Sequence, residues 1–241
     1  MTVLVPTMGA LHKGHQALIK RARELDKEVV VSIFVNPLQF SESSDLEKYP
    51  RTPEADIQLA TLAGATEVWF PNYEEIYPSN PKQISAGPVG DLYEGASRPG
   101  HFAGVLTVVN RLFEIVKPNA AIFGEKDFQQ LWLVKNHFQK MNIISVPTVR
   151  EFDGLALSSR NIRLSEKDRE AALVISKALK EPSRMNEVLA TEPGFKLDYA
   201  EIIDAQTFKL ADEDTQSKRA IIAGWVNGVR LLDNAVVDTI S

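Results

Sequence analysis

The chain has 241 residues, of which 44% are hydrophobic and 24% charged, the composition of an ordinary globular protein. Its net charge of −5, with 27 basic and 32 acidic residues and no block of one sign, argues against a general nucleic-acid surface. The absence of cysteine excludes disulfides and thiolate metal sites, and no signal peptide or apolar run of roughly 20 residues is present, so we expect a cytoplasmic location.

The first polar turn of the chain runs from Pro6 to His15. Thr2–Val5 before it is apolar and β-branched, which predicts a buried strand, and apolar residues recur at helical spacing from Lys13 onward. In an open parallel sheet such a turn lies at the carboxyl ends of the strands, where ligands bind. The sequence therefore predicts a ligand-binding turn between the first strand and the first helix.

Two glycines and two histidines give this turn its chemistry. Gly9 and Gly14 allow a ligand to approach the backbone, and the helix N-terminus that follows favours a phosphate. His12 and His15 lie three residues apart, so both imidazoles can face one anion. The alternative is a glycine turn whose histidines are only surface residues.

A second buried strand is predicted for Val29–Val35, and Asn36 and Gln39 follow it. Their amides then lie level with the histidine turn and can bind a polar or hydroxylated ligand group. Equally, they can serve only to fix their own loop. Beyond them, residues 41–49 are expected to be a loop.

The next predicted helix begins at Pro53, with Thr52 as a good N-cap. Its expected buried face is apolar and consists of Ile57, Leu59, Ala60 and Leu62. Residues 68–70 make a third short strand, and residues 71–99 form a long excursion without a core of its own.

A helix with an apolar stripe follows this excursion. Arg98 and His101 lie at its N-terminus, where they can meet an anion or form a solvated cap. The stripe is expected to be core and consists of Val105, Val108, Val109, Leu112, Phe113 and Val116.

A fourth strand is predicted for Ala120–Phe123, followed by Gly124–Asp127 and a helix that continues to about Met141. Lys126 at a strand end is a compact cation suited to phosphate. Asp127 can hold this lysine, bind a ribose hydroxyl or help to bind a metal. The alternative is an exposed helix start with a good cap.

The last parallel strand is predicted for Ile143–Val149, and Arg150–Gly154 is a turn. Ser158, Ser159 and Arg160 then make a compact cluster of donors suited to triphosphate oxygens, although serine pairs also cap helices.

The remaining chain is predicted to form a small α+β domain. A helix begins at Ser165, residues 180–196 form a broken linker, and three strand-like runs close the chain: Tyr199–Ile203, Ala220–Trp225 and Val229–Leu232. We therefore expect an α/β protein with a Rossmann-like, doubly wound parallel sheet at residues 1–148 and a small C-terminal lid domain at 149–241.

Six strings of this sequence resemble, in order and in spacing, the pantothenate synthetase family of the His-x-Gly-His nucleotidyltransferases. These strings are Pro6–His15, Phe34–Phe40, Tyr49–Arg51, Arg98–Phe102, Phe123–Leu131 and Asp153–Asn161. The resemblance implies an ATP- and Mg²⁺-dependent ligase that forms pantoyl adenylate from pantoate and transfers the acyl group to β-alanine. It also implies a homodimer that acts in pantothenate biosynthesis, without nucleic-acid or membrane partners.

The resemblance assigns roles residue by residue. It implies that ATP contacts Met8, Gly9, Ala10, Leu11, His12, Lys13, Gly14, His15, Gly124, Glu125, Lys126, Asp127, Val149, Leu157, Ser158, Ser159 and Arg160. Of these, the catalytic residues are His12, His15, Lys126, Ser158 and Arg160, with His15 in the place of the family's proton donor. Asn36, Gln39 and Gln130 would hold pantoate, and the protein ligands of the metal are unassigned. We expect the histidines, Lys126, Arg160 and Mg²⁺ to supply positive charge for phosphate chemistry.

Two other functions fit parts of this pattern. One is a different adenylyl- or cytidylyltransferase on the same sheet, but the amides at Asn36, Gln39 and Gln130 favour a small hydroxy acid over a phosphorylated substrate. The other is an inactive nucleotide-binding scaffold, against which the intact histidine turn and Lys126 argue. The sequence departs from the family pattern in its shorter linker at 180–196, which predicts a reduced lid.

Overall fold

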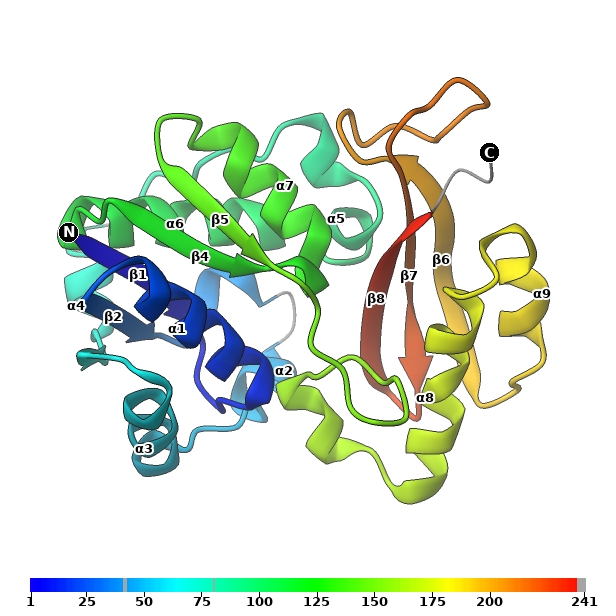
Figure 1. The fold of residues 1–241 in the computed structure, drawn as a ribbon, viewed down its shortest axis with the longest axis horizontal. Helices are drawn as coiled ribbons and strands as arrows, with labels where there is room; N and C mark the ends of the chain where they lie inside the picture. Colours follow the sequence, from blue (N-terminus) through cyan, green and yellow to red (C-terminus); the bar gives the residue numbers. More distant parts are fainter. Residues whose placement is uncertain (41–42, 80, 238–241) are drawn as a thin grey trace. The chain divides into compact units, whose positions relative to one another are not determined.

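The computed structural model describes residues 1–40, 43–79 and 81–237. The chain forms two compact units, Met1–Thr148 and Val149–Ser241. The first unit holds a parallel sheet with helices on both faces, and the second an antiparallel sheet with helices (Figure 1). The predicted fold class, a doubly wound α/β unit followed by a small α+β unit, is confirmed.

The strands of the first unit pair in the order β3-β2-β1-β4-β5, and every pair is parallel. Their bounds are Thr2–Thr7 (β1), Glu28–Ile33 (β2), Glu67–Trp69 (β3), Ala120–Gly124 (β4) and Asn142–Val146 (β5). The order runs outward in one direction from β1 and in the other from β4. The switch point therefore lies between β1 and β4, the position at which ligands bind in open α/β sheets.

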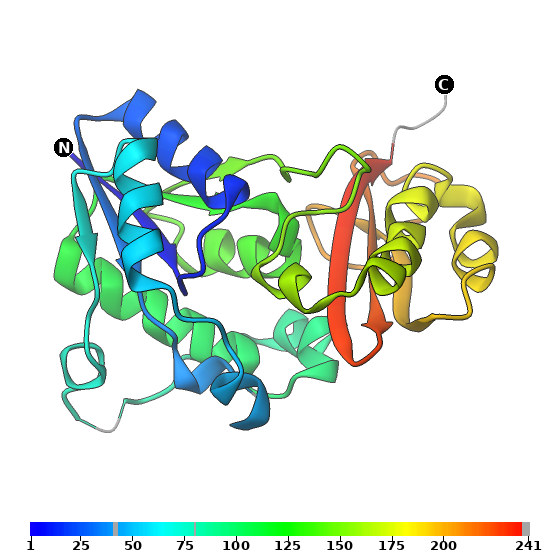
Figure 2. The same cartoon turned by 90° about the horizontal axis from the view of Figure 1, so that it is seen from below.

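Four long helices cover the two faces of this sheet: α1 (Lys13–Leu25), α3 (Pro53–Ala63), α6 (His101–Val116) and α7 (Phe128–His137). Figure 2 shows the sheet between the α1–α3 side and the α6–α7 side. Alternate residues of β1 face opposite sides of the sheet. Val3 and Val5 pack in the core with α1 and α3, and Leu4 packs in the core with α6. A strand buried on both faces explains the continuous apolar run in the sequence.

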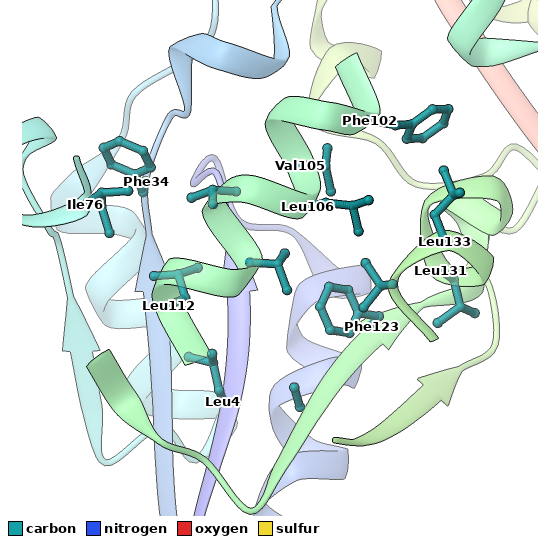
Figure 3. Packing of buried hydrophobic residues seen from close by; sticks show 14 of the residues in the cluster. Leu4, Phe34, Ile76, Phe102, Val105, Leu106, Leu112, Phe123, Leu131 and Leu133 are labelled. Carbon is teal, nitrogen blue, oxygen red and sulfur yellow. The ribbon is translucent and has the colours of Figure 1, made fainter. Parts of the chain in front are cut away.

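The predicted apolar stripe of α6 lies in the larger core. Figure 3 shows Val105, Leu106 and Leu112 of this helix with Leu4 of β1 and Phe123 of β4. Of the predicted stripe, four residues are buried and two, Phe113 and Val116, are partly buried against the same core.

Short elements occupy the segments predicted as irregular. A helix, α2 (Ser43–Glu47), lies in the expected loop 41–49, whose residues 41 and 42 are outside the described chain. The excursion after β3 contains α4 (Tyr73–Ile76), the 3₁₀ helix η2 (Pro88–Asp91) and α5 (Glu94–Ser97). It has no core of its own, as predicted, because its apolar side chains join the core under α6.

The buried face of α3 differs from the prediction. Ile57 is 44% exposed and Leu62 84% exposed, whereas Asp56, Ala60 and Ala63 are buried. The helix therefore turns a carboxylate toward the protein and two large apolar residues toward solvent. The contacts of Asp56, described below, give the reason.

The second unit is built on the antiparallel sheet β6-β7-β8. Its elements are the 3₁₀ helices η4 (Ser159–Arg163) and η5 (Pro182–Arg184), the helices α8 (Glu166–Ala178) and α9 (Met185–Ala190), and the strands β6 (Phe195–Asp204), β7 (Lys218–Val226) and β8 (Val229–Val237). The broken linker predicted for residues 180–196 is wrong, because α9 forms there and buries Met185 and Leu189 in this unit's core. Among the described residues, no helix has the length and apolar character needed to cross a membrane.

Candidate active site

The β1–α1 turn is a rigid capping structure. His12 is the N-cap of α1, and its Nδ1 accepts a hydrogen bond from the Gly14 amide at 3.1 Å. In return, Nδ1 of His15 accepts from the His12 amide at 3.2 Å. The two rings lie with their centroids 4.1 Å apart. This reciprocal capping fixes both imidazoles at the helix start.

These hydrogen bonds also decide how the histidines can act. Each Nδ1 accepts, so each neutral ring carries its proton on Nε2 and presents an N–H donor. Burial, followed by the charge of Lys126, lowers the pKa of His12 to about 4. Burial, followed by the neighbouring His12 and Lys126, lowers the pKa of His15 to about 3. In this structure both rings are therefore neutral N–H donors at pH 7, and the expectation that they supply positive charge to a bound phosphate stays a prediction.

Asp56 of α3 holds the backbone of the same turn. Its carboxylate accepts from the Ala10 amide at 3.0 Å and from the Leu11 amide at 2.7 Å. The turn is tight, with positive φ at Gly9 (84°) and Ala10 (48°). A Cβ at Gly9 would lie 3.0 Å from the Asp56 carboxylate, so this crowding and the positive φ both favour glycine there.

Thr52 also serves Asp56 rather than capping its own helix. It occupies the predicted N-cap position of α3, but its hydroxyl donates to the Asp56 carboxylate at 3.1 Å and makes no side-chain cap. The buried carboxylate thus has three donors, which compensates the cost of its burial. No pattern in the sequence indicated this role, because Asp56 lies in no polar motif.

Lys126 comes to the same edge of the sheet from β4. It lies in the 3₁₀ helix η3 (Glu125–Asp127) directly after that strand, and its charge acts on both His12 and His15. Its Nζ lies 3.7 Å from a carboxylate oxygen of Asp127, which is the lysine-holding role among those predicted for Asp127. Since β1 and β4 are neighbouring parallel strands, the turns after them lie at the same edge of the sheet, and the charge of Lys126 acts on the two neutral N–H donors.

Asn36 is the N-cap of the 3₁₀ helix η1 (Pro37–Gln39) after β2, and Gln39 is the last residue of that helix. Both are buried, and Asn36 Nδ2 donates to Gln39 Oε1 at 3.0 Å. The Gln39 amide nitrogen lies 2.8 Å from the sulfur of Met8, in the β1–α1 turn. The predicted pantoate residue Gln39 and the predicted nucleotide turn are thus in direct contact.

Both polar atoms of the Asn36 side chain make further hydrogen bonds within the protein. Its Nδ2 also donates to the Gly104 carbonyl at 3.0 Å, and its Oδ1 accepts from the Leu38 amide at 3.2 Å and from the Tyr77 hydroxyl at 2.9 Å. Gly104 permits this contact, because a Cβ there would lie 2.3 Å from the Leu38 carbonyl oxygen. In this structure Asn36 therefore positions η1, and direct contact between Asn36 and substrate stays a prediction.

The adjacent glutamines of α7 have different surroundings. Gln129 is buried and donates to the carbonyls of Val89 and Leu92, each at 2.8 Å, while its Oε1 accepts from the Glu94 amide at 3.1 Å. Gln130 is half-buried and lies about 100° further round the helix. Gln129 thus ties the excursion to α7, and binding of pantoate by Gln130 stays a prediction.

Arg98 and His101 do not form the solvated cap that was one of two expectations. His101 is 6% exposed, and Arg98 pairs with the buried Glu94 at 3.2 Å. Both side chains contact the main-chain carbonyl of Gln39.

The serine–arginine loop lies in the second unit. Arg150 forms a two-pronged ion pair with the buried Asp233 of β8, and Asp153 pairs with Arg169 at 2.7 Å. These ion pairs fix the predicted turn, and the Leu157 amide donates to the Val149 carbonyl at 3.0 Å.

Ser158 then caps η4, accepting from the amide of Arg160 at 3.3 Å. The serine thus forms the cap that the sequence left open as the alternative. Binding of a triphosphate by this loop stays a prediction.

A family model described as pantoate-beta-alanine ligase matches residues 1–236. This chain belongs to the pantoate–β-alanine ligase family. Among curated members, the pantothenate synthetase of Saccharopolyspora erythraea is 47% identical over 97% of this chain and 83% of the relative. That of Bacteroides fragilis is 45% identical over 96% of this chain and 89% of the relative.

Solved structures of the pantoate–β-alanine ligase family agree with the fold. The pantothenate synthetase of Thermus thermophilus superposes with a TM-score of 0.92 at 42% identity, over 97% of this chain and 92% of that one. The ligase of Francisella tularensis, solved as a complex with "beta-gamma ATP" and β-alanine, has a TM-score of 0.84 at 38% identity, over 98% and 89%. The resemblance seen in the sequence is thereby confirmed.

Proposed function

We infer that this chain condenses pantoate with β-alanine to pantothenate, converting ATP to AMP and pyrophosphate. One observation carries this inference within the family: the histidine turn and Lys126 follow the neighbouring strands β1 and β4 at one edge of the sheet, and the amide of Gln39 contacts that turn at Met8. The proposed phosphate site and the proposed site for a small hydroxy acid are thus adjacent. Adjacency is what an acyl-adenylate mechanism needs, since the carboxylate must reach the α-phosphorus.

The first half-reaction forms the adenylate. An oxygen of the pantoate carboxylate attacks the α-phosphorus of ATP, the bond to the bridging oxygen breaks, and pyrophosphate leaves with its electron pair. We propose that Nε2–H of His12 and of His15 donate to phosphate oxygens and that Lys126 neutralises charge at the α-phosphate. Such preorganised donors stabilise charge that develops in the transition state without covalent participation by the protein.

The second half-reaction transfers the acyl group. The amine of β-alanine attacks the acyl carbon of pantoyl adenylate, AMP leaves, and the nitrogen loses a proton as the amide forms. Gln39 and Gln130 are proposed to hold the hydroxyls and carboxylate of pantoate through both steps. A glutamine amide offers both a donor and an acceptor, which match the hydroxyls and the carboxylate of pantoate, and this match supports the role.

Mg²⁺ is proposed to enter bound to the triphosphate. The described residues hold no group of three or more histidine or acidic side chains that could bind a metal by themselves. Mg²⁺ on a nucleotide usually keeps several waters and uses one or two carboxylates, and Asp127, 49% exposed beside Lys126, fits that role. When bound, the ion would add positive charge at the phosphates.

Two further assignments stay proposals. Val149 and Leu157–Arg160 of the second unit are proposed to contact adenine and the triphosphate, supported by the donor chemistry of Ser158, Ser159 and Arg160. The chain is also proposed to be a homodimer, which sedimentation equilibrium would test.

The decisive experiment is isotope exchange between pyrophosphate and ATP. We expect exchange that requires pantoate and does not require β-alanine, because the adenylate forms reversibly before the amine is used. Adding β-alanine should then release AMP and pantothenate. Exchange that required β-alanine would contradict an adenylate intermediate in this protein.

A further inference from the structure

A buried polar cluster beside Gln39 has no part in the function described so far. It consists of Glu94 of α5, Arg98 between α5 and α6, and His101 at the start of α6. Glu94 is 4% exposed, His101 6%, and the side chain of Arg98 17%. Polar and charged groups are costly to bury unless partners compensate the loss of water, so the contacts of the cluster indicate what it does.

The contacts converge on the main-chain carbonyl of Gln39. Nδ1 of His101 lies 2.7 Å from this oxygen, and Nη2 of Arg98 lies 3.2 Å from it. Nη1 of Arg98 reaches Oε1 of Glu94 at 3.2 Å and Nε2 of His101 at 3.4 Å. Two strong donors on one carbonyl fix the position of the residue that carries it.

The tautomer of His101 follows from these contacts. A guanidinium can only donate, so Nε2 of His101 accepts from Arg98, and its proton lies on Nδ1 and is donated to Gln39. Burial, followed by the charge of Arg98, lowers the pKa of His101 to about 4, which keeps this ring neutral at pH 7. Glu94 balances the charge of Arg98 and holds the guanidinium in place.

We propose that His101 and Arg98 are positioning residues that hold Gln39 by its main-chain carbonyl so that its side-chain amide is directed at pantoate. This inference rests on the proposed role of Gln39. The side-chain amide of Gln39 contacts Asn36 and Met8. Gln39 is therefore held at its main chain by the buried polar cluster and at its side chain by these two residues.

Two isosteric substitutions of His101 separate positioning from general packing. In His101→Asn the amide nitrogen takes the place of Nδ1 and keeps the donor to Gln39, whereas in His101→Gln it takes the place of Nε2 and loses that donor. We expect His101→Gln to raise the pantoate KM about tenfold, which is about 1.4 kcal/mol, with the ATP KM unchanged. His101→Asn should stay near the wild type. Equal pantoate KM values in both variants would overturn the proposal, whatever their melting temperatures.

A double-mutant cycle tests whether His101 acts through Gln39. If it does, His101→Gln should add almost nothing to the pantoate KM of Gln39→Ala. A further tenfold increase in that background would overturn the proposal. If Gln39→Ala itself left the pantoate KM unchanged, the proposed role of Gln39 would fail, and with it this inference. A defective Gln39→Ala beside a normal His101→Gln would overturn this inference alone.

Arg98→Lys provides a test that does not depend on the folding of the histidine variants. A lysine keeps the positive charge beside Glu94 but lacks the fork that reaches Glu94, His101 and Gln39 together. We expect a raised pantoate KM with the ATP KM unchanged. Arg111→Lys is the matched control on α6, where Arg111 pairs with the exposed Glu114, and it should behave as wild type. No difference between the two arginine variants would contradict the positioning role.

Discussion

At the scale of single residues, the main property of the proposed phosphate site is that Lys126 carries the positive charge and the two histidines are neutral. The rings of His12 and His15 are neutral donors, so the cation that acts on them is Lys126. Burial and the charge of Lys126 both favour the neutral imidazoles, because a second positive charge there would be repelled. A bound polyphosphate would act in the opposite direction and favour protonation.

Lys126→Ala should therefore slow ATP–pyrophosphate exchange by about 10²–10³-fold, the typical cost of removing one preorganised donor. His15→Ala should do the same through loss of its Nε2–H. Circular dichroism and melting should show that the fold survives, and Lys135→Ala, an exposed lysine at the end of α7, is the matched control. Preformed pantoyl adenylate with β-alanine should bypass most of the defect. A variant equally slow on the adenylate would place these residues in amide formation instead.

The paired glutamines of α7 give a second residue-level prediction. Gln130→Ala should raise the pantoate KM far more than the ATP KM, since each lost hydrogen bond to a buried hydroxyl or carboxylate costs about 1–3 kcal/mol. Gln129→Ala should instead lower the melting temperature, because it removes hydrogen bonds to Val89, Leu92 and Glu94. Steady-state kinetics with each substrate varied, together with calorimetry, would distinguish the two. Equal weakening of pantoate and ATP would remove Gln130 from the pantoate site.

At the scale of elements, α3 and the β1–α1 turn act as one unit through Asp56. The turn has two consecutive residues at positive φ, a conformation that needs external support at Ala10. The Asp56 carboxylate supplies it by accepting the amides of Ala10 and Leu11. The same contact explains why α3 exposes Leu62, since the rotation that buries Asp56 turns that face outward.

Asp56→Asn keeps the shape of the side chain but replaces one acceptor with a donor that faces an N–H group. We expect weaker ATP binding by about tenfold and a lower melting temperature, in line with about 1.5–3 kcal/mol for a hydrogen bond to a charged group. Glu54→Gln, an exposed acid in the same helical turn, should change neither. Isothermal titration with a non-hydrolysable ATP analogue would measure the affinity. Unchanged affinity in Asp56→Asn would show that the turn keeps its shape without the carboxylate.

At the scale of the whole molecule, the neutral histidines His12, His15 and His101 couple stability to pH. The pKa values of His12 and His101 are lowered to about 4 and that of His15 to about 3, from 6.5 in the unfolded chain. Between these values the unfolded chain binds more protons than the folded one. Stability should thus be complete above pH 6.5 and fall as the pH drops toward 4, by up to about 1.4 kcal/mol per pH unit for each histidine.

Urea denaturation at several pH values would measure this slope. His101→Asn removes one of the three titrating groups while keeping its donor, so its slope between about pH 6 and 4.5 should be smaller than that of the wild type. An identical slope in the two proteins would show that His101 titrates normally in the folded state. This readout is independent of activity.

Much of this protein was determined by the sequence alone. Buried parallel strands appear as continuous apolar runs, and the turns after them carry their polar residues within a few positions, so the order of elements and the gathering of these turns at one edge of the sheet were predictable. The motif from Pro6 to His15 is local, and the helix start after it follows from the residues themselves, whereas the capping role of His12 appears only in the structure. For the same reason the turn at Arg150–Gly154 and the helix at Ser165 were predicted correctly.

The tertiary structure decided what depends on partners distant in the sequence. Asp56 reaches residues 10 and 11, Tyr77 and Gly104 hold Asn36, and His101 holds Gln39, and no periodicity or motif connects those pairs. The charge of the histidines was also decided there, because the pKa of an imidazole depends on its burial and on the charges that folding brings near it. Local patterns determine which groups point to one edge of the sheet; burial and long-range contacts determine their protonation, their orientation and which of them are left to meet a ligand.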